Sequence, residues 1–522
     1  MALDWHRILD LLAQHVQLSF AALGLGLLIA LPLAIWSARS RTVANVTLGF
    51  ASLIQTIPAL ALLALFFPLL LALSAVFGDA ISPLGFLPSL LALTLYALLP
   101  ILRNAVTGLR SVEPEMVEAA DGVGMTRLQK LWLVEAPLAS PTIMAGVRTA
   151  AVWTIGAATL STTVGQPSLG DLIFAGLQTQ NWSLVLAGCL ASAGLAISVD
   201  LLLGLIESGI RWRKHRRIWL AGIALALGLG AALWPAPQTD RPVVTIGAKR
   251  FSEQYVLARL IGRRLEAAGY AVRYREGLGS AVVFRALASD DVQVYVDYAG
   301  TIWTNEMQRQ DPEPRADMIA EIARWTKEQH GVRLIGPLGF ENTYAFAVRP
   351  DDARRLNLRT LDDVVRVAPD FVFGTDVEFL ERPEWQMVQA AYPLRFKARR
   401  AFEPTFMYRA LSLGEADIIS AFSSDGRIAA NGFVVLDDPK GAIPSYDAIL
   451  MVSRSAARDA RLVEALQPLV GAIPVEKMRE ANYRVDRDDN KQSPADSAAW
   501  LDDAITPPLS APSSAPSQGK NR

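Results

Sequence analysis

The chain has 522 residues and a formal net charge of −1, which excludes a strongly basic, nucleic-acid-binding protein. Its composition is uneven, because Asp79 is the only charged residue between Thr42 and Leu102, whereas the chain after Pro237 is rich in Arg, Asp and Glu. A part with membrane composition is therefore followed by a part that reads as soluble and globular.

Six apolar stretches are long enough to cross a bilayer, whose core of about 30 Å needs about 20 helical residues. They are residues 16–36, 51–77, 83–101, 142–164, 184–206 and 218–234. Basic residues follow the first, third and fifth stretches, whereas the loops 78–82 and 165–183 contain no Lys or Arg. The positive-inside rule then predicts that the soluble part is exported.

Two features of the apolar part leave alternatives open. Arg148 and Asp200 fall inside the fourth and fifth stretches, where each reaches the interface alone or the two form an ion pair. The stretch 218–234 resembles the apolar core of a signal peptide, but its internal position and the absence of a clear cleavage site favour a retained anchor. The single cysteine, Cys189, lies in a stretch, so no disulfide is expected in the exported part.

Residues 113–137 form a charged element between two apolar stretches, on the predicted cytoplasmic side. Pro114 between two acids suits the start of a helix, and Gly124 interrupts it. The spacing of Thr126 and Gln129 is that of a capping box, so a second helix should begin there and end at Pro137. We expect a helix, a glycine turn and a helix across the inner mouth of the bundle.

This element resembles the signature of ABC importer permeases, E-A-A, three residues, G, nine residues, I-x-L-P. The matching residues are Glu118, Ala119, Ala120, Gly124 and Pro137, with Val134 and Ala136 at the positions of Ile and Leu. Residues 55–69 also resemble the second-span motif of the betaine and choline branch. The resemblance implies docking into a cleft on an ATPase subunit. No G-x-x-x-x-G-K-[ST] loop occurs here, so ATP would be bound by a separate polypeptide.

Strand and helix patterns alternate after residue 243, beginning with a β-branched strand and an amphipathic helix in 243–270. They continue at 292–298, 316–331, 342–348, 359–368, 371–375 and 406–422. Such alternation predicts open sheets flanked by helices, in two lobes with a cleft between them. The four histidines form no cluster and no nucleophile motif occurs, so no catalytic or metal-binding residue is predicted, although a carboxylate pair assembled in space stays open.

Aromatic residues stand where predicted strands run into loops, at Tyr298, Tyr344, Phe422 and Tyr446. Taken singly, each would be an ordinary core or surface aromatic. Together they lie in segments of 243–500 that resemble the glycine betaine, carnitine and choline binding proteins. These segments are GAKRFSEQYVL, DYAGT, GFENTYA, FSSDGRI and YDAILMV.

The resemblance implies that these four aromatics surround a trimethylammonium group, with Gln254 and Ser280 near the ligand. A quaternary cation has no N–H to donate, so ring faces are its natural partner, each site being worth about 2 kcal/mol when desolvated. Phe422 stands where the family commonly has tyrosine, so the ring face is kept and the hydroxyl is lost.

We therefore expect an all-α, six-span membrane bundle of the ABC importer permease type, followed by an exported α/β, two-lobed domain of the type II periplasmic-binding-protein class. The expected regions are 1–210 (permease domain), 211–234 (additional anchor), 235–242 (linker), 243–502 (substrate-binding domain) and 503–522 (disordered tail). Within the binding domain, lobe 1 would comprise 243–340 and 447–502, and lobe 2 would comprise 341–446.

The resemblance further implies two copies of this chain in the plasma (inner) membrane, in contact with lipid and with two ATPase subunits. Such a complex would import a quaternary amine such as glycine betaine, choline, carnitine or ergothioneine, without a cofactor in this chain. Two alternatives stay open: a membrane-anchored solute sensor without transport, and a tethered exported hydrolase.

Overall fold

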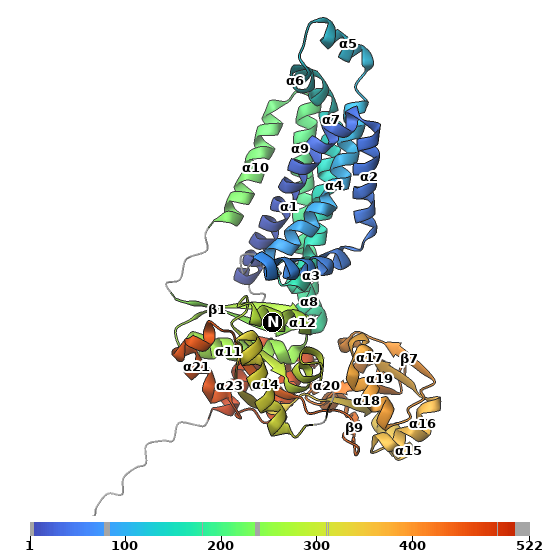
Figure 1. Cartoon of the computed structure of the whole chain (residues 1–522), viewed down its shortest axis with the longest axis vertical. Coiled ribbons are helices and arrows are strands. Elements are labelled where there is room, and N and C mark those ends of the chain that lie inside the picture. Colours follow the sequence, from blue (N-terminus) through green and yellow to red (C-terminus); the bar gives the residue numbers. More distant parts are fainter. Residues whose placement is uncertain are drawn as a thin grey trace, which may run out of the picture.

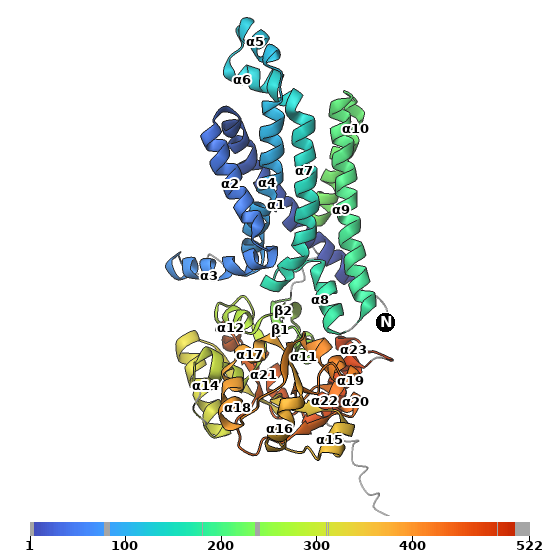
Figure 2. The ribbon, with the colours of Figure 1, turned by 90° about the vertical axis from the view of Figure 1, so that its right-hand side faces the viewer.

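A helical bundle and a two-lobed α/β part stand end to end in the structure (Figure 1, Figure 2). The computed structural model describes residues 5–77, 84–179, 181–234, 241–309, 311, 313–487 and 489–506. The loop 78–82, most of the expected linker and most of the expected tail lie outside the described residues.

The bundle is built from long apolar helices. They are α1 (Trp5–Arg39), α2 (Arg41–Thr56), α3 (Ala59–Phe77), α4 (Phe86–Arg110), α7 (Ala136–Ala158), α9 (Trp182–Arg211) and α10 (His215–Leu233). Within the described ranges, five helical stretches are long and apolar enough to cross a membrane, and α2 and α3 together make a sixth if they count as one bent span. The basic segment 211–217 and the ends of α1 and α4 lie at the end of the bundle far from the α/β part (Figure 1).

The second expected span, 51–77, is not one straight helix. A bend of 101° separates α2 from α3, which lies across the end of the bundle that faces the α/β part (Figure 2). Pro58 causes the break, because it has no N–H to donate and disfavours helical backbone at Ile57, whose ψ is 125°. The hydroxyl of Tyr96 in α4 donates to the Ile57 carbonyl that the break leaves free.

The charged element forms two short helices, α5 (Pro114–Gly122) and α6 (Arg127–Lys130), at the opposite end of the bundle (Figure 1). The prediction that Pro137 ends the second helix is wrong. A π-helical turn (Leu131–Glu135) joins α6 to α7, and the Ala136 N–H bonds the Leu131 carbonyl, five residues back. This widened turn accommodates the proline ring without ending the helix.

Arg148 and Asp200 form an ion pair inside the bundle. The Arg148 Nε and Nη2 atoms each lie 2.9 Å from an Asp200 oxygen, so α7 is bonded to α9 in a bidentate manner. A second acid, Glu207, accepts from Arg148 Nη1 at 2.8 Å. The structure therefore favours the ion pair over separate interfacial side chains, and it adds a partner that the sequence analysis did not name.

Two five-stranded sheets form the α/β part. The first sheet has the order β2 (Ala271–Leu278), β1 (Val243–Lys249), β3 (Val294–Tyr298), β10 (Asp447–Val452), β4 (Arg333–Glu341). The second has the order β7 (Ala398–Ala401), β6 (Val372–Thr375), β8 (Ile418–Phe422), β5 (Tyr344–Val348), β9 (Val434–Leu436). We call the part around the first sheet lobe 1 and the part around the second sheet lobe 2.

Helices pack on both sheets. They are α11 (Ser252–Ala267), α12 (Ser280–Ala288), α13 (Ala299–Thr301), α14 (Arg315–His330), α15 (Pro350–Leu356), α16 (Leu361–Val367), α17 (Val377–Glu381), α18 (Pro383–Ala391), α19 (Pro404–Leu413), α20 (Gly426–Asn431), α21 (Ala460–Leu466), α22 (Val475–Asp486) and α23 (Pro494–Ile505). The apolar positions of α11, such as Val256, Leu260 and Leu265, are fully buried in the core of lobe 1, as the helical spacing predicts.

Lobe 1 rests on the bundle through polar and apolar contacts. Glu276 at the end of β2 accepts from Arg7 of α1 and from Arg259 of α11, both at 2.7 Å. Leu84, just before α4, is buried in the same apolar cluster as Leu278 of β2. Helix α8 (Gly170–Gln178) lies between the bundle and the α/β part (Figure 1). These contacts place a permease-side helix beside the lobes.

Candidate functional site

A cleft of about 420 Å³ opens between the two lobes. Five of the six residues that the sequence analysis placed at a ligand line it, namely Ser280, Tyr298, Tyr344, Phe422 and Tyr446. Further lining residues come from both lobes, and Gln178, the last residue of α8, also lines it. The cleft is therefore bounded by lobe 1, lobe 2 and the bundle.

The aromatic residues converge because strand ends meet at the cleft. Tyr298 ends β3, while Tyr344 begins β5 and faces Phe422, the last residue of the antiparallel strand β8. The centroid of the Tyr344 ring lies 5.0 Å from that of Phe422 and 5.9 Å from that of Tyr446. A fifth ring, Phe251, stacks 6.1 Å from Tyr298. The rings thus form one contiguous aromatic cluster.

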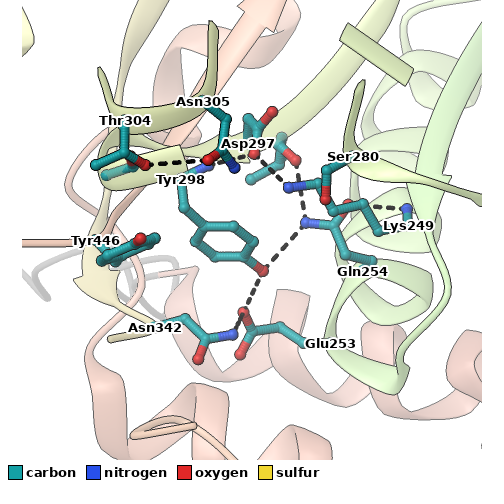
Figure 3. A network of polar contacts seen from close by, with 12 residues as sticks. Lys249, Glu253, Gln254, Ser280, Asp297, Tyr298, Thr304, Asn305, Asn342 and Tyr446 are labelled. Carbon is teal, nitrogen blue, oxygen red and sulfur yellow. Dashed lines mark hydrogen bonds and ion pairs between the residues drawn. The ribbon is translucent and has the colours of Figure 1, made fainter. Parts of the chain in front are cut away.

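Gln254 does not line the cleft. It lies behind Tyr298, where its Nε2 donates to the Tyr298 hydroxyl at 3.1 Å and to the Val296 carbonyl at 3.0 Å (Figure 3). The Tyr298 hydroxyl in turn donates to Glu253 at 2.6 Å. Burial, together with the neighbouring Glu253 carboxylate, raises the pKa of Tyr298 well above its usual value, so the hydroxyl keeps its proton. Gln254 supports the ring rather than lining the cleft.

Tyr446 is held in place by a hydrogen bond to lobe 2 and by packing of its ring against the backbone at Gly300. Its hydroxyl donates to Glu384 of α18, a buried carboxylate that also accepts from Thr304 at 3.1 Å. The Tyr446 ring lies against Gly300, where an added Cβ would come within 2.4 Å of a ring carbon. The glycine of the DYAGT segment is therefore required for the ring to reach its place.

Two buried cations accompany the rings. The Nζ atom of Lys249 lies 2.6 Å from Asp297 Oδ1 and 5.3 Å from the centroid of the Tyr298 ring. Arg382, whose side chain is 8% exposed, lies 5.4 Å from the Tyr344 ring and bonds Glu378. The Nε–H of Arg382 has no hydrogen-bond partner among the described residues. The cleft therefore offers ring faces to a cation, and Arg382, which pairs with Glu378 and Glu384, adds a positive charge to its lining.

The sequence analysis did not name Phe251 or Arg382. Phe251 lies within the segment GAKRFSEQYVL, so its presence in a matched stretch was an available signal. Arg382 had none, because it lies outside the matched segments and only the fold brings it to Tyr344. Ser280 begins α12, and its hydroxyl donates across the cleft to Glu378 at 3.3 Å, so it also links the lobes.

The charged element at residues 113–137 has the expected local geometry. Thr126 and Gln129 form the capping box, with the Thr126 N–H donating to Gln129 Oε1 at 2.8 Å. Gly124 has a φ of +80°, and no heavy atom lies within 4 Å of an added Cβ. Glu118, Ala119 and Pro137 are exposed, whereas Ala120 is buried.

Apolar side chains of the same element face outward. Val123, Leu128 and Trp132 are 73%, 69% and 66% exposed, beyond the end of the apolar bundle helices. Large apolar side chains exposed close together in the sequence of a charged element are consistent with a protein–protein contact.

Two family descriptions match the chain. Residues 242–503 match the substrate binding domain of ABC-type glycine betaine transport systems, and residues 26–212 match the inner membrane component of binding-protein-dependent transport systems. The ergothioneine transport permease/ergothioneine binding protein EgtU of Helicobacter pylori (strain G27) is 29% identical over 457 residues, which cover 84% of this chain and 80% of that protein.

Further relatives match one part of the chain. The choline transport system permease protein OpuBB of Bacillus subtilis (strain 168) is 40% identical over 194 residues, 37% of this chain and 84% of that protein. A solved structure of a glycine betaine/carnitine/choline ABC transporter is 25% identical with a TM-score of 0.45, and covers 49% of this chain and 97% of that one.

Both parts thus belong to one transport system, which removes the solute sensor and the hydrolase as alternatives. The chain is a membrane protein with an extracytoplasmic binding domain, and it is not itself an enzyme. It belongs to the osmoprotectant ABC importer family, as a fused permease and substrate-binding protein.

Proposed function

We propose that this chain imports a zwitterionic quaternary amine, held in the cleft by Tyr298, Tyr344, Phe422 and Tyr446 together with Phe251. The observation that carries the proposal is that five rings and the buried Arg382 line one cleft between two lobes. The rings suit a trimethylammonium group, and Arg382 suits a carboxylate. Glycine betaine, carnitine and ergothioneine carry both groups, whereas choline has no carboxylate.

The names of the relatives support this class of solute. EgtU is named for ergothioneine, and the permease relatives are named for choline, carnitine and glycine betaine. All of these solutes share the quaternary head, so the rings are the common determinant and Arg382 is the group that distinguishes among them.

The remaining parts of the proposal concern assembly. Two copies of the chain form the pore, and each contacts a separate ATPase subunit through residues 113–137. The exposed Val123, Leu128 and Trp132 support this contact, as does the positive φ of Gly124 in the turn between the helices. The basic residues at this end support a cytoplasmic position in the plasma (inner) membrane.

We also propose the division into regions 1–210, 211–234, 235–242, 243–502 and 503–522. The strands support the two lobes, because β1 to β4 and β10 form one sheet and β5 to β9 the other. Helix α10 lies beside α9 and α1 and supports the assignment of an additional anchor.

Calorimetric titration of the purified full chain with glycine betaine, carnitine, ergothioneine and choline tests the proposal. At least one zwitterion should bind more tightly than choline, and Arg382→Met should remove that preference while retaining affinity for choline. The Met side chain keeps most of the apolar contact on Tyr344 and removes the charge. If no quaternary amine binds, or a neutral carbon isostere binds equally well, the proposal fails.

A further inference from the structure

A buried carboxylate lies directly behind the aromatic cleft. Glu253, the second residue of α11, is 3% exposed and accepts four hydrogen bonds. Its Oε1 accepts from the Tyr298 hydroxyl at 2.6 Å and from Asn342 Nδ2 at 2.9 Å (Figure 3). Its Oε2 accepts from the Ser424 hydroxyl at 2.5 Å and from Asn482 Nδ2 at 2.9 Å.

Two of these donors belong to segments at the junction of the lobes, one in a crossing and one in a loop of lobe 2. Asn342 lies in the two-residue connection from β4 of lobe 1 to β5 of lobe 2. Ser424 lies after β8 of lobe 2, before α20, which packs on α22 of lobe 1. The two segments also bond each other, because Ser423 and Thr343 exchange hydrogen bonds of 2.9 Å.

The other two donors, Asn482 and Tyr298, come from lobe 1. Asn482 comes from α22 in lobe 1 and also donates to the Ser424 carbonyl at 2.9 Å. Tyr298 brings its ring to the cleft. One carboxylate therefore joins a ring that lines the cleft to the crossing at Asn342, to the lobe 2 loop at Ser424 and to helix α22 of lobe 1.

The charge of Glu253 suits this role. An ionised carboxylate only accepts, so it can satisfy all four donors at once. Burial raises the pKa of Glu253, while the four donors act against that rise. A glutamine amide would keep the shape but turn one end into a donor that faces two other donors. The network is thus complete for glutamate and mismatched for its closest isostere.

We propose that Glu253 is a positioning residue that couples occupancy of the cleft to closure of the two lobes. The inference rests on the proposed function, because it needs a solute that packs on Tyr298. A solute against the ring fixes the Tyr298 hydroxyl, the hydroxyl fixes Glu253, and Glu253 fixes the crossing at Asn342 and the lobe 2 loop at Ser424. Glu253 itself does not line the aromatic cleft.

Closure is measured as the distance between the lobes in the full chain in lipid nanodiscs. Cys189→Ser removes the single native cysteine, and spin labels are placed at the exposed positions Glu328 of α14 and Asp351 of α15. Glycine betaine and ergothioneine serve as probes. In the labelled chain that keeps Glu253, a saturating concentration of either probe should shorten the distance between the two spin labels. If neither probe binds or changes it, the proposed function fails.

Three variants separate coupling from general stability. Glu253→Gln should weaken binding about tenfold, the size of one hydrogen bond to a charged group, and should leave the lobes open at saturation. Tyr298→Phe keeps the ring face and removes the hydroxyl that bonds Glu253 and Gln254, so it should show the same loss of closure. The variant Gln254→Met separates the second of these bonds. The double variant should lose no more than either single one, because both interrupt one path.

Gln254→Met is the matched control. Gln254 neighbours Glu253 on α11 and bonds the same Tyr298 hydroxyl, but its other partners, the Val296 carbonyl and the Lys249 N–H, are all in lobe 1. This variant should weaken binding yet keep full closure at saturation. Full closure of Glu253→Gln at saturation overturns the inference. If Glu253→Gln does not fold, Tyr298→Phe and Ser424→Ala decide the question by the same distance.

Discussion

The element at residues 113–137 and the cleft between the lobes differ in how they are built. The first is assembled from neighbours in sequence: its capping box joins Thr126 to Gln129, and Lys130 bonds Asp121 at 2.7 Å. The cleft joins residues as distant as Phe251 and Tyr446. A contact site for another protein can be made locally on an exposed surface, whereas a site that encloses a small solute needs several chain segments to meet.

The largest effect is expected at Gly124, in the locally built element at residues 113–137. We expect Gly124→Val to abolish solute uptake while leaving solute binding intact, because a β-branched residue is strained at a φ of +80°. Gly122→Val is the matched control, since Gly122 also has open space around it but no positive φ. Uptake by proteoliposomes with the ATPase present measures the effect. Normal uptake by Gly124→Val would contradict the local account.

Tyr298→Leu tests the cleft. Leucine keeps most of the apolar area and removes the ring quadrupole, so binding should weaken by roughly 2 kcal/mol, about thirtyfold. Calorimetric titration of the full chain measures this loss. Added salt should change the affinity little, because the attraction acts at short range in a closed site. A Tyr298→Leu chain that binds betaines like the original would make the rings ordinary packing residues.

Arg148 offers a third test, because it joins two helices inside the bundle. Arg148→Ala leaves both Asp200 and Glu207 without this partner, so it should lower the yield of folded protein more than Asp200→Ala does. The double variant should lose less than the sum of the two. Arg211→Ala, which removes only the exposed partner of Glu207, should have little effect. Strictly additive losses would show that the ion pair contributes nothing to folding.

The smallest effect is expected at Phe422. Phe422→Tyr restores the hydroxyl common in the family, and its half-buried ring should allow that hydroxyl to reach water at the edge of the cleft. Affinity should stay the same or improve severalfold, as measured by the same titration. A tenfold loss would mean that the edge of this ring is already filled by neighbouring atoms.

The sequence predicted much of the local structure and less of what depends on distant contacts. Pro114, Gly124 and the pair Thr126 and Gln129 have the predicted roles because their reasons lie within one turn of helix. Pro137 does not end its helix, because a π-helical turn compensates for it and the long helix α7 continues. Local rules give the penalty of a proline but not the packing that overcomes it.

The site shows the same limit. The family resemblance pointed to four rings at predicted strand ends, and all four line the cleft, yet Gln254 lies behind Tyr298 and not at the cleft. Arg382 reaches Tyr344 only through the fold of lobe 2, which brings the start of α18 to the start of β5. Residues 447–502 were expected in lobe 1, but the place of β10 between β3 and β4 in the first sheet was not predicted. Such insertions follow from long-range packing, which a pattern of alternating strands does not specify.

Only residues 235–240 separate Trp234, just after α10, from Arg241, where the described chain resumes just before β1 of lobe 1. Covalent geometry limits this connection to roughly 25 Å. A domain held on so short a connection has an effective concentration at its own permease on the order of millimolar. The docking contacts at Glu276 and Leu278 therefore need only millimolar affinity to be occupied for much of the time. A weak contact of this kind separates readily, and a freely diffusing binding protein would compete poorly for the same surface.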